Sequence, residues 1–225
     1  MRAELRLRRM DTGEQLTFSP DRLVVAAFTG RDHEQVERHI DELARQGVPR
    51  PVRVPDFYSL PVDLLTTAQE ISVDGGETSG EAEPVLYLTS GGWFVGAGSD
   101  HTARDLERED IPLSKEACAK VVSREVLPYE AVEQRWDELV LRSWAGERLY
   151  QEAPLSELMP VPEIMRRLGE ASPNGGGDAV VFLGTVPLAT ESFVFADQFR
   201  VELRTPQGDI AMGLSYRVLS KGGAR

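Results

Sequence analysis

The sequence predicts a mostly β fold of the α+β class, and three observations lead to this prediction. Apolar and polar residues alternate in many short segments, which is typical of half-buried strands. Only two or three segments repeat apolar residues at helical spacing. The 225-residue chain also shows no internal repeat with a period of about 20 to 50 residues and no long linker. We therefore expect one mainly β structure with few helices.

The first fifty residues predict a hairpin, a strand and a helix. "AELRLRR" and "QLTF" alternate around the turn "DTGE", and "DRLVVAAFTG" reads as a buried strand that ends at glycine. Between Asp32 and Gln46, apolar residues recur at helical spacing, with Asp32 placed to cap the first turn. We expect residues 1–50 to pack on a main domain formed by residues 51–225.

The rest of the chain predicts mostly strands. The proline-rich stretch from Val48 to Pro61 favours extended backbone and excludes a regular helix. The expected strands and hairpins lie at "AQEISV", "EPVLYLTSGGWFVGAGS", "ELVLRSWAGERLYQEA", "DAVVFLG" and the pair "QFRVELRT" and "DIAMGLSYRVL". The two expected helices are "TARDLERED" and "VPEIMRRLGEAS", the second with Pro162 in its first turn.

Composition narrows the classes of partner. The chain has 37 acidic and 25 basic residues, a net charge of −12 and no basic cluster, so we expect neither nucleic acid nor a membrane surface as a partner. It has no apolar run of about 18 residues and no signal-like start, which predicts a cytoplasmic protein. Cys118 is the single cysteine, so we expect a buried thiol and no intrachain disulfide.

Two carboxylates stand where the pattern predicts a buried strand. In "SGEAEPVLYL", Glu81 and Glu83 are two residues apart, so in an extended strand they project from one face about 7 Å apart. A partly buried pair would have to protonate, turn out into water or share a cation. The alternative is a solvated loop after Gly80.

Two further acidic residues stand in constrained turns. Asp100 lies in the glycine-rich stretch "GAGSDHTARDLE", where it could bind a ligand or cap the following helix. Asp56 lies between prolines in "VPDFYSLP", where it could equally form an Asx turn.

Four motifs in order give the chain a resemblance to a known family. "DFYS", then Glu-x-Glu before an apolar strand, then "SDHTARD", then "VVFLGTVP" resemble the motifs of the fumarylacetoacetase superfamily. The resemblance runs from about residue 54 to residue 219, whereas the first 50 residues match loosely. It implies a β-roll of mixed sheets with a few peripheral helices, and a homodimer.

The resemblance also implies a metal site. The matching positions of the family bind a divalent cation, which gives Asp56, Glu81, Glu83 and Asp100 as ligands. Carboxylate ligands suit hard cations, so Mg²⁺ is expected, with Mn²⁺ or Ca²⁺ as alternatives. Such a cation stabilises an enolate made from a small 2-oxo acid, so the resemblance implies a small-molecule carboxylate as substrate.

Further residues match positions that act on substrate in the family. Arg104 and Lys115 would hold substrate or stabilise negative charge, or they could be surface cations. The match of Lys115 is the less secure one, because Lys120 lies nearby in the sequence. Tyr58 and Thr185 could offer hydroxyl groups, or could be packing and turn residues.

The general base departs from the family pattern. In fumarylacetoacetases proper a histidine follows "DFYS", whereas here the comparable position is near Asp63. His101 could replace that base, or it could be structural, since adjacent side chains usually diverge. Ser99 and Glu107 also replace the usual Asn and Gln.

The resemblance therefore implies a metal-dependent hydrolase that cleaves a C–C bond in an acylpyruvate-like or other 2-oxo acid. The absent histidine keeps a second possibility open, a decarboxylase, isomerase or dehydratase that uses the same enolate. A third possibility is a non-catalytic binding protein that keeps the fold.

Overall fold

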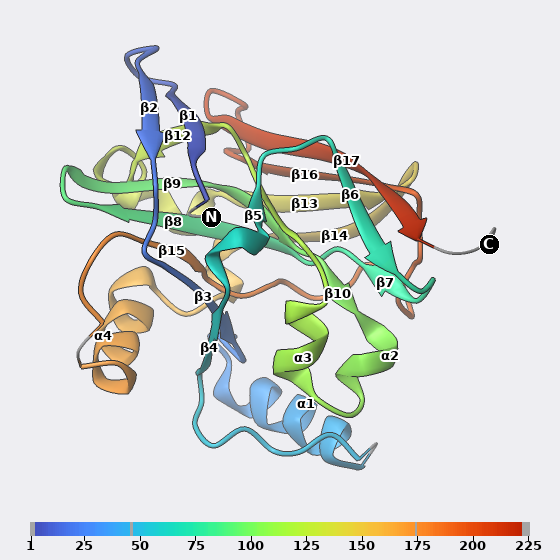
Figure 1. Cartoon of the computed structure of the whole chain (residues 1–225). Helices are drawn as coiled ribbons and strands as arrows, with labels where there is room; N and C mark the ends of the chain where they lie inside the picture. Colours follow the sequence, from blue (N-terminus) through green and yellow to red (C-terminus); the bar gives the residue numbers. More distant parts are fainter. Residues whose placement is uncertain (1–2, 46, 174, 222–225) are drawn as a thin grey trace.

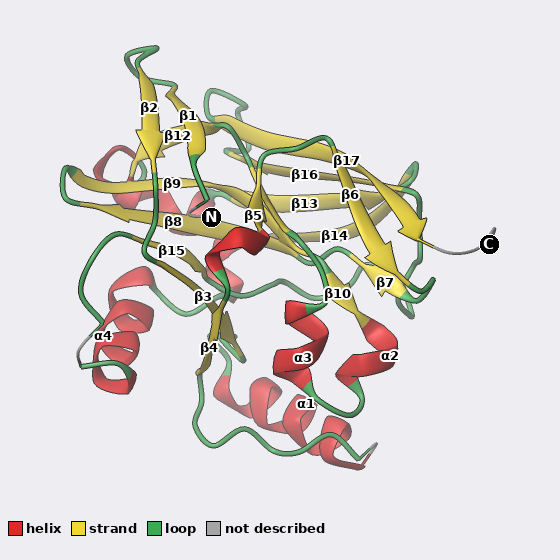
Figure 2. Cartoon of the chain, in the orientation of Figure 1, coloured by secondary structure: helices red, strands yellow, loops and turns green. Residues whose placement is uncertain are grey.

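The protein is mostly β, as the sequence predicts, and its strands form two large sheets that pack against each other (Figures 1 and 2). The computed structural model describes residues 3–45, 47–173 and 175–221. Its helices lie at the outside of the sheets, with α1, α2 and α3 gathered at one end of the molecule. The prediction of an α+β fold is confirmed.

The larger sheet has ten strands and is mixed. Its main order is β2-β1-β12-β9-β8-β15-β3-β4, and β11 pairs with both β9 and β5. Parallel pairs join β1 to β12, β15 to β3 and β11 to β5. The strands are β1 (Leu5–Arg9), β2 (Gln15–Phe18), β3 (Arg22–Ala27), β4 (Asp56–Leu60), β5 (Leu65–Thr66), β8 (Ala82–Thr89), β9 (Gly92–Asp100), β11 (Lys120–Val122), β12 (Glu125–Pro128) and β15 (Ala179–Phe182).

The second sheet has five strands in the order β14-β13-β16-β17-β6. Only the β17–β6 pair is parallel. The strands are β6 (Glu70–Asp74), β13 (Val140–Ala145), β14 (Arg148–Pro154), β16 (Gln198–Arg204) and β17 (Ala211–Lys221), and a separate short pair joins β7 (Thr78–Ser79) to β10 (Thr102–Ala103).

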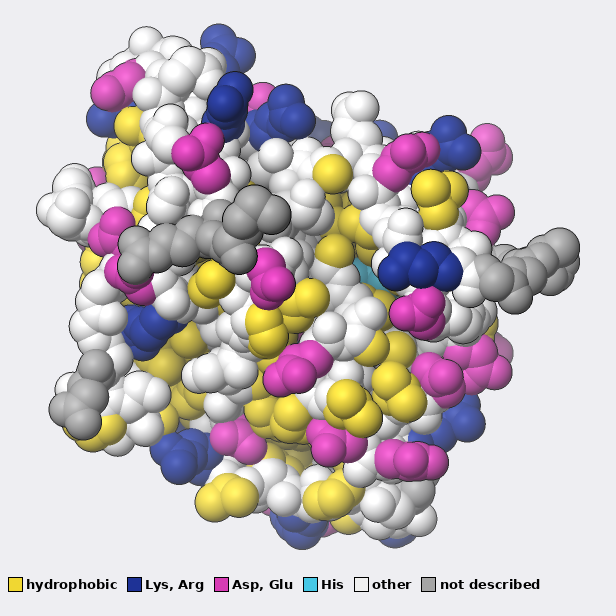
Figure 3. Space-filling view, viewed as in Figure 1, with side chains coloured by type: hydrophobic (Ala, Val, Ile, Leu, Met, Phe, Trp, Pro, Cys, Tyr) yellow, Lys and Arg dark blue, Asp and Glu magenta, His cyan; other side chains and the backbone are white. Residues whose placement is uncertain are grey.

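The helices of the described residues are short. They are α1 (His33–Arg45), α2 (Arg104–Glu107), α3 (Ile111–Glu116) and α4 (Val161–Ala171), with 3-10 turns at Val62–Leu64, Tyr129–Ala131, Glu133–Glu138 and Leu155–Glu157. None of these described helices has the length and apolar character needed to span a membrane. The described side chains on the face shown in Figure 3 mix acidic and basic groups without a continuous basic patch.

The predicted elements are largely confirmed. The four expected hairpins or strand pairs form β1–β2, β8–β9, β13–β14 and β16–β17, all antiparallel. In α1 the Asp32 carboxylate accepts hydrogen bonds from the amides of Glu34 and Gln35, as a helix cap does. Its expected last residue, Gln46, lies outside the described residues. The sequence patterns did not predict β5, β7, β10, β11, β12 or α3, and the expected helix "TARDLERED" begins only at Arg104, after the strand β10.

The N-terminal segment shares a sheet with the rest of the chain. β3 lies between β15 and β4 in the larger sheet, and β1 joins it at β12. Strands from residues 1–50 and 51–225 therefore form one hydrogen-bonded layer.

The central strands β8 and β9 are buried on both faces, which explains the continuous apolar run after Pro84. Leu86 faces the core between the two sheets, whereas Val85 and Tyr87 face a second cluster on the opposite side. Glycine is required at Gly98, since a Cβ there would collide with Val85 and Phe182. This close packing brings the first residues of β8 against the last residues of β9.

Candidate cation site

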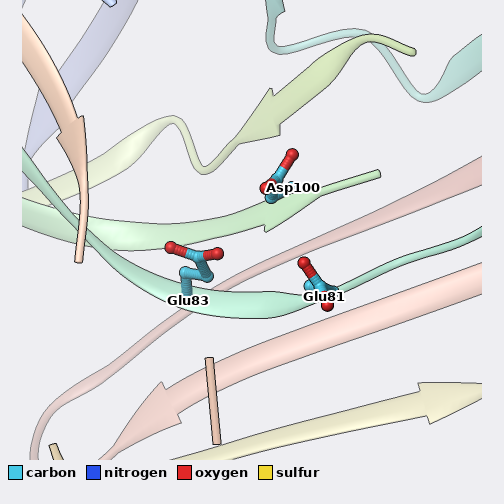
Figure 4. A group of neighbouring side chains, drawn as sticks. All are labelled: Glu81, Glu83 and Asp100. Atoms are coloured by element: carbon cyan, nitrogen blue, oxygen red, sulfur yellow. The ribbon is translucent and has the colours of Figure 1, made fainter. Parts of the chain in front are cut away.

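Three carboxylates meet where β8 begins and β9 ends. The antiparallel register sets Glu83 opposite Gly98, and the backbone N–H of Asp100 donates to the carbonyl of Glu81 at 2.9 Å. Because side chains alternate along a strand, Glu81, Glu83 and Asp100 project from the same face of this pair. Each offers an oxygen within 4.8 Å of the others. Figure 4 shows the three side chains at the neighbouring ends of the two strands.

The site is buried but is not sealed. Glu83 and Asp100 are almost fully buried, whereas the Glu81 side chain keeps 15% of its surface exposed. The Glu83 carboxylate accepts a hydrogen bond of 2.7 Å from the backbone N–H of Gly184, which follows β15. Gly184 has a φ of +98°, and Thr29 occupies the space that a Cβ would need. This turn therefore places a backbone N–H donor beside the buried Glu83 carboxylate.

Two lysines neutralise the cluster. Lys115, from α3, contacts Asp100 Oδ2 and lies 3.2 Å from Glu81 Oε2. Lys120, from β11, lies 2.7 Å from Asp100 Oδ1 and donates to the backbone carbonyls of His101 and Lys115. Sequence reasoning treated Lys120 only as a rival of Lys115. The signal for it was a lysine that opens the apolar run "KVVS", where a buried charge needs a partner.

Arg104 is a third cationic side chain beside the carboxylate cluster. Its Nη1 lies 3.1 Å from Glu81 Oε1 and 2.7 Å from Glu107 Oε2, and its Nε donates to Ser79 Oγ at 2.8 Å. The guanidinium carbon lies 4.0 Å from the centre of the Phe193 ring, a cation–π contact. The buried Nη2 has no hydrogen-bond partner among the described residues. Arg104 is thus held on three sides with donor capacity left over.

Burial and neighbouring charges shift the three carboxyl groups in different directions. Burial alone would raise the pKa of Asp100, but Lys115 and Lys120 outweigh it and lower this pKa to about 2. Burial also acts against ionised Glu81, and Arg104 and Lys115 outweigh it, so its pKa falls. The pKa of Glu83 is raised well above its usual range by burial and by the charge of Asp100. Without a further positive charge, burial and the charge of Asp100 therefore disfavour the ionised form of Glu83.

The residues fit a hard divalent cation. Three oxygens within 4.8 Å of one another can all lie about 2.0–2.6 Å from one ion, and carboxylates are the ligands that such ions prefer. Within the described part of the chain, Asp100 Oδ1 is buried without a hydrogen bond of regular geometry, although the Lys120 ammonium lies 2.7 Å away. A cation would also supply the positive charge that ionised Glu83 lacks.

Asp56 and Tyr58 lie on β4, apart from the carboxylate group. The Asp56 carboxylate accepts a hydrogen bond from the amide of Phe57, and Asp56 is not among the residues within 4.8 Å. Burial, and then the charge of Asp56, raises the pKa of Tyr58 to about 12, while the nearby Lys115 acts in the opposite direction. Asp56 as a fourth ligand and Tyr58 as a substrate contact stay predictions.

The side chains of Thr185 and His101 form hydrogen bonds with other parts of the fold. The Thr185 hydroxyl donates to the carbonyl of Ala82 at 2.9 Å and accepts from Gln151 Nε2 at 2.7 Å. The two ring nitrogens of buried His101 lie 2.9 Å from the hydroxyls of Tyr216 and Thr78. His101 follows Asp100 in an extended chain and so faces the opposite side, which favours the structural alternative, and its role as a base stays a prediction. The role of Thr185 as a substrate contact stays a prediction.

Two cavities lie away from the carboxylates. One, of about 430 Å³, is lined by residues of α4 and the β8–β9 turn, including Trp93 and Leu168. The other, of about 520 Å³, lies between strands of the two sheets and is lined by Val121 and Leu214 among others. Neither cavity is lined by a carboxylate of the cluster.

The chain matches a protein-family model in sequence and solved structures in fold. The family model described as "Protein of unknown function (DUF2848)" matches residues 26–216. No curated protein matches the sequence. Solved structures do match, and they show that the chain has the fumarylacetoacetase-like fold. The superfamily resemblance of the four sequence motifs is thereby confirmed at the level of fold.

Three of these structures show the range of proteins that share the fold. Fumarylpyruvate hydrolase from Pseudomonas aeruginosa, in complex with Mn²⁺ and pyruvate, is 18% identical with a TM-score of 0.65, over 98% of this chain and 97% of that one. A structure from Oleispira antarctica described as "a putative fumarylacetoacetate isomerase/hydrolase" is 16% identical with a TM-score of 0.65, over 95% of this chain and 99% of that one. A 2-keto-3-deoxy-D-arabinonate dehydratase complexed with magnesium and 2,5-dioxopentanoate is 18% identical with a TM-score of 0.61, over 91% and 74%.

Proposed function

Since the chain belongs to the DUF2848 family and has the fumarylacetoacetase-like fold, we propose that it is a divalent-cation-dependent enzyme that acts on a small 2-oxo acid through an enolate. The observation that carries this proposal is the meeting of Glu81, Glu83 and Asp100 at the buried ends of two strands. Buried carboxylates at this spacing are costly unless a positive charge compensates them. Fold neighbours solved with Mn²⁺ or magnesium support Mg²⁺ or Mn²⁺ as that charge.

The cation would be held by Glu81, Glu83 and Asp100. When bound, it supplies a Lewis acid that polarises the 2-oxo group and stabilises the negative charge of an enolate. Arg104 provides donors for an anionic substrate, because its Nη2 is buried and has no hydrogen-bond partner in the described part of the chain. Phe193 covers the guanidinium and limits its exchange with water.

Charge favours a carboxylate substrate once the cation is bound. In the structure, Lys115, Lys120 and Arg104 face ionised Glu81 and Asp100, together with Glu107 at the rim. A divalent cation that ionises Glu83 adds two positive charges and one negative charge, and the two positive charges are concentrated at the ion itself. A substrate carboxylate is attracted to that concentrated charge whether or not Lys115 stays beside it.

The type of reaction depends on whether a general base lies close enough to the cation site to activate water. Hydrolysis of a C–C bond needs a group that activates water, and the ring nitrogens of His101 are engaged by Tyr216 and Thr78. Among the described residues, the other histidines are His33 and His39 of α1. This arrangement favours decarboxylation, isomerisation or dehydration over hydrolysis, with hydrolysis of an acylpyruvate as the alternative.

The test pairs cation binding with turnover. Mn²⁺ binding is measured by calorimetry for the wild type and for Glu83→Gln, with Glu42→Gln on the exposed face of α1 as the matched control. Glu83→Gln should lower the affinity by at least the roughly 10- to 100-fold that losing even an outer-shell partner costs. A panel of acylpyruvates, oxaloacetate and sugar-derived 2-oxo acids is then screened with Mg²⁺ or Mn²⁺. Turnover that survives in both Glu81→Ala and Glu83→Ala would contradict the proposal.

A second candidate function is a non-catalytic binding protein. It is favoured by one observation, that Lys115, Lys120 and Arg104 already pair with two of the three carboxylates. Cation binding without turnover of any panel member would support this candidate.

Assembly and location are separate proposals. The fold resemblance is the support for a homodimer, which mass measurement in solution would test. A cytoplasmic location is likewise proposed from the sequence, and fractionation of the producing cells would test it.

A further inference from the structure

The two lysines of the site are held in different ways. Lys120 donates to the backbone carbonyls of His101 and Lys115 as well as facing Asp100, and its side chain has no exposed surface. The ammonium of Lys115 has no backbone acceptor among its described contacts, which are the carboxylates of Glu81 and Asp100. Lys120 is thus fixed by the fold, whereas Lys115 is held by charge.

The partners of Lys115 are two of the three carboxylates that would hold the cation. Its Nζ lies 3.2 Å from Glu81 Oε2 and contacts Asp100 Oδ2, so it stands within the same cluster of oxygens. An ammonium and a divalent cation that use the same oxygens repel each other, and this repulsion is strong at a buried site.

We propose that Lys115 is an exchangeable counter-ion, which occupies the carboxylate cluster in the cation-free protein and leaves it when a divalent cation binds. This inference rests on the proposed function, because it takes Glu81, Glu83 and Asp100 as the cation ligands. Lys120 remains in place through its carbonyl contacts and stays paired with Asp100. Lys115 therefore sets the cation affinity of the site and protects the empty protein from repulsion among its carboxylates.

The placement of Lys115 on α3 suits this exchange. α3 is a single short helix outside the sheets, and Asp110 caps its first turn by accepting from the Leu113 amide at 2.9 Å. Lys115 lies in its last turn with 5% of its side chain exposed, and a change of its rotamer would break no strand pairing. By contrast, Lys120 is within β11, which is paired on both sides.

The experiment compares four proteins by direct binding and by stability. Mn²⁺ association with the wild type, Lys115→Met, Lys115→Gln and Lys221→Met is measured by calorimetry, and thermal unfolding is followed in EDTA and in MnCl₂. Lys221 is exposed at the end of β17 and is the matched control. Lys115→Gln keeps a polar side chain in case the methionine variant folds poorly.

If Lys115 exchanges with the cation, its replacement should lower the stability of the cation-free protein and raise the affinity for Mn²⁺. Lys115→Met and Lys115→Gln should unfold at a lower temperature than the wild type in EDTA, because the carboxylates lose a counter-ion. Both should bind Mn²⁺ about tenfold or more tightly, and MnCl₂ should restore most of the lost stability. Lys221→Met should match the wild type in every measurement.

The outcomes separate this inference from the proposed function. If the wild type binds Mn²⁺ and both Lys115 variants bind it equally or more weakly, the counter-ion role is overturned and the cation site stands. If only the Lys115 variants bind Mn²⁺, the counter-ion role is supported and the proposed wild-type function fails. If none of the proteins binds Mn²⁺, both are wrong.

Discussion

The Asp100 carboxylate and the Lys120 ammonium form an ion pair with no exposed side-chain surface, in which Oδ1 lies 2.7 Å from Nζ. The pair joins the end of β9 to the start of β11, because Asp100 is also the backbone partner of Lys120 in the antiparallel register. Removal of one member of a buried pair leaves an uncompensated charge, which is more costly than the pair itself. The pair is therefore expected to stabilise the fold as well as to prepare a cation ligand.

Lys120→Met should lower the free energy of unfolding by about 3–5 kcal/mol in EDTA, since it leaves Asp100 buried with one counter-ion fewer. Urea denaturation measures this, with Lys221→Met as a surface control that should stay within about 0.5 kcal/mol of the wild type. An unchanged unfolding midpoint in Lys120→Met would show that the pair contributes nothing.

Gly98→Ala should destabilise the protein by about 1–3 kcal/mol, because a Cβ at this position meets Val85 and Phe182 within the central strand pair. Gly76→Ala is the matched control, since the space around that glycine is open. The difference between the two variants in thermal unfolding is the measurement. Equal stability would mean that β8 and β9 are packed less closely than described.

His101→Asn should lower the free energy of unfolding by about 1–3 kcal/mol, because it disrupts buried hydrogen bonds with Tyr216 and Thr78. The pH dependence of turnover should stay that of the wild type, since the ring does not face the carboxylates. Loss of one limb of the pH–rate profile in a stably folded His101→Asn protein would restore His101 as a general base.

Cys118 should react slowly with iodoacetamide in the native protein, because burial raises the pKa of its thiol to about 11. The thiolate is the reactive form, so the rate should rise with pH throughout the range below about 11, whereas in urea it should level off near the ordinary thiol pKa. Mass spectrometry at several pH values measures both rates. Rapid native labelling at pH 7 would contradict the burial of this side chain.

Much of the fold could be predicted from local patterns. The hairpins β1–β2 and β16–β17 were predictable because alternation and turn residues lie in adjacent sequence. The segment Ile111–Glu116 is too short to show a helical period, so α3 could not be predicted in the same way.

In the candidate site, too, features set by local sequence could be predicted, whereas features set by tertiary packing could not. The common direction of Glu81 and Glu83 follows from the two-residue period of a strand, and the same rule separates His101 from Asp100. The counter-ions Lys115 and Lys120 were not predictable as a pair, because α3 and β11 bring them to Asp100 only through tertiary packing.

In the proposed enzyme Glu81, Glu83 and Asp100 together hold one divalent cation. Anomalous diffraction from a crystal grown with Mn²⁺ tests this directly. A single strong peak about 2.0–2.6 Å from a carboxylate oxygen of each residue is expected. A peak elsewhere, or no peak and the ammonium of Lys115 still between Glu81 and Asp100, would contradict it.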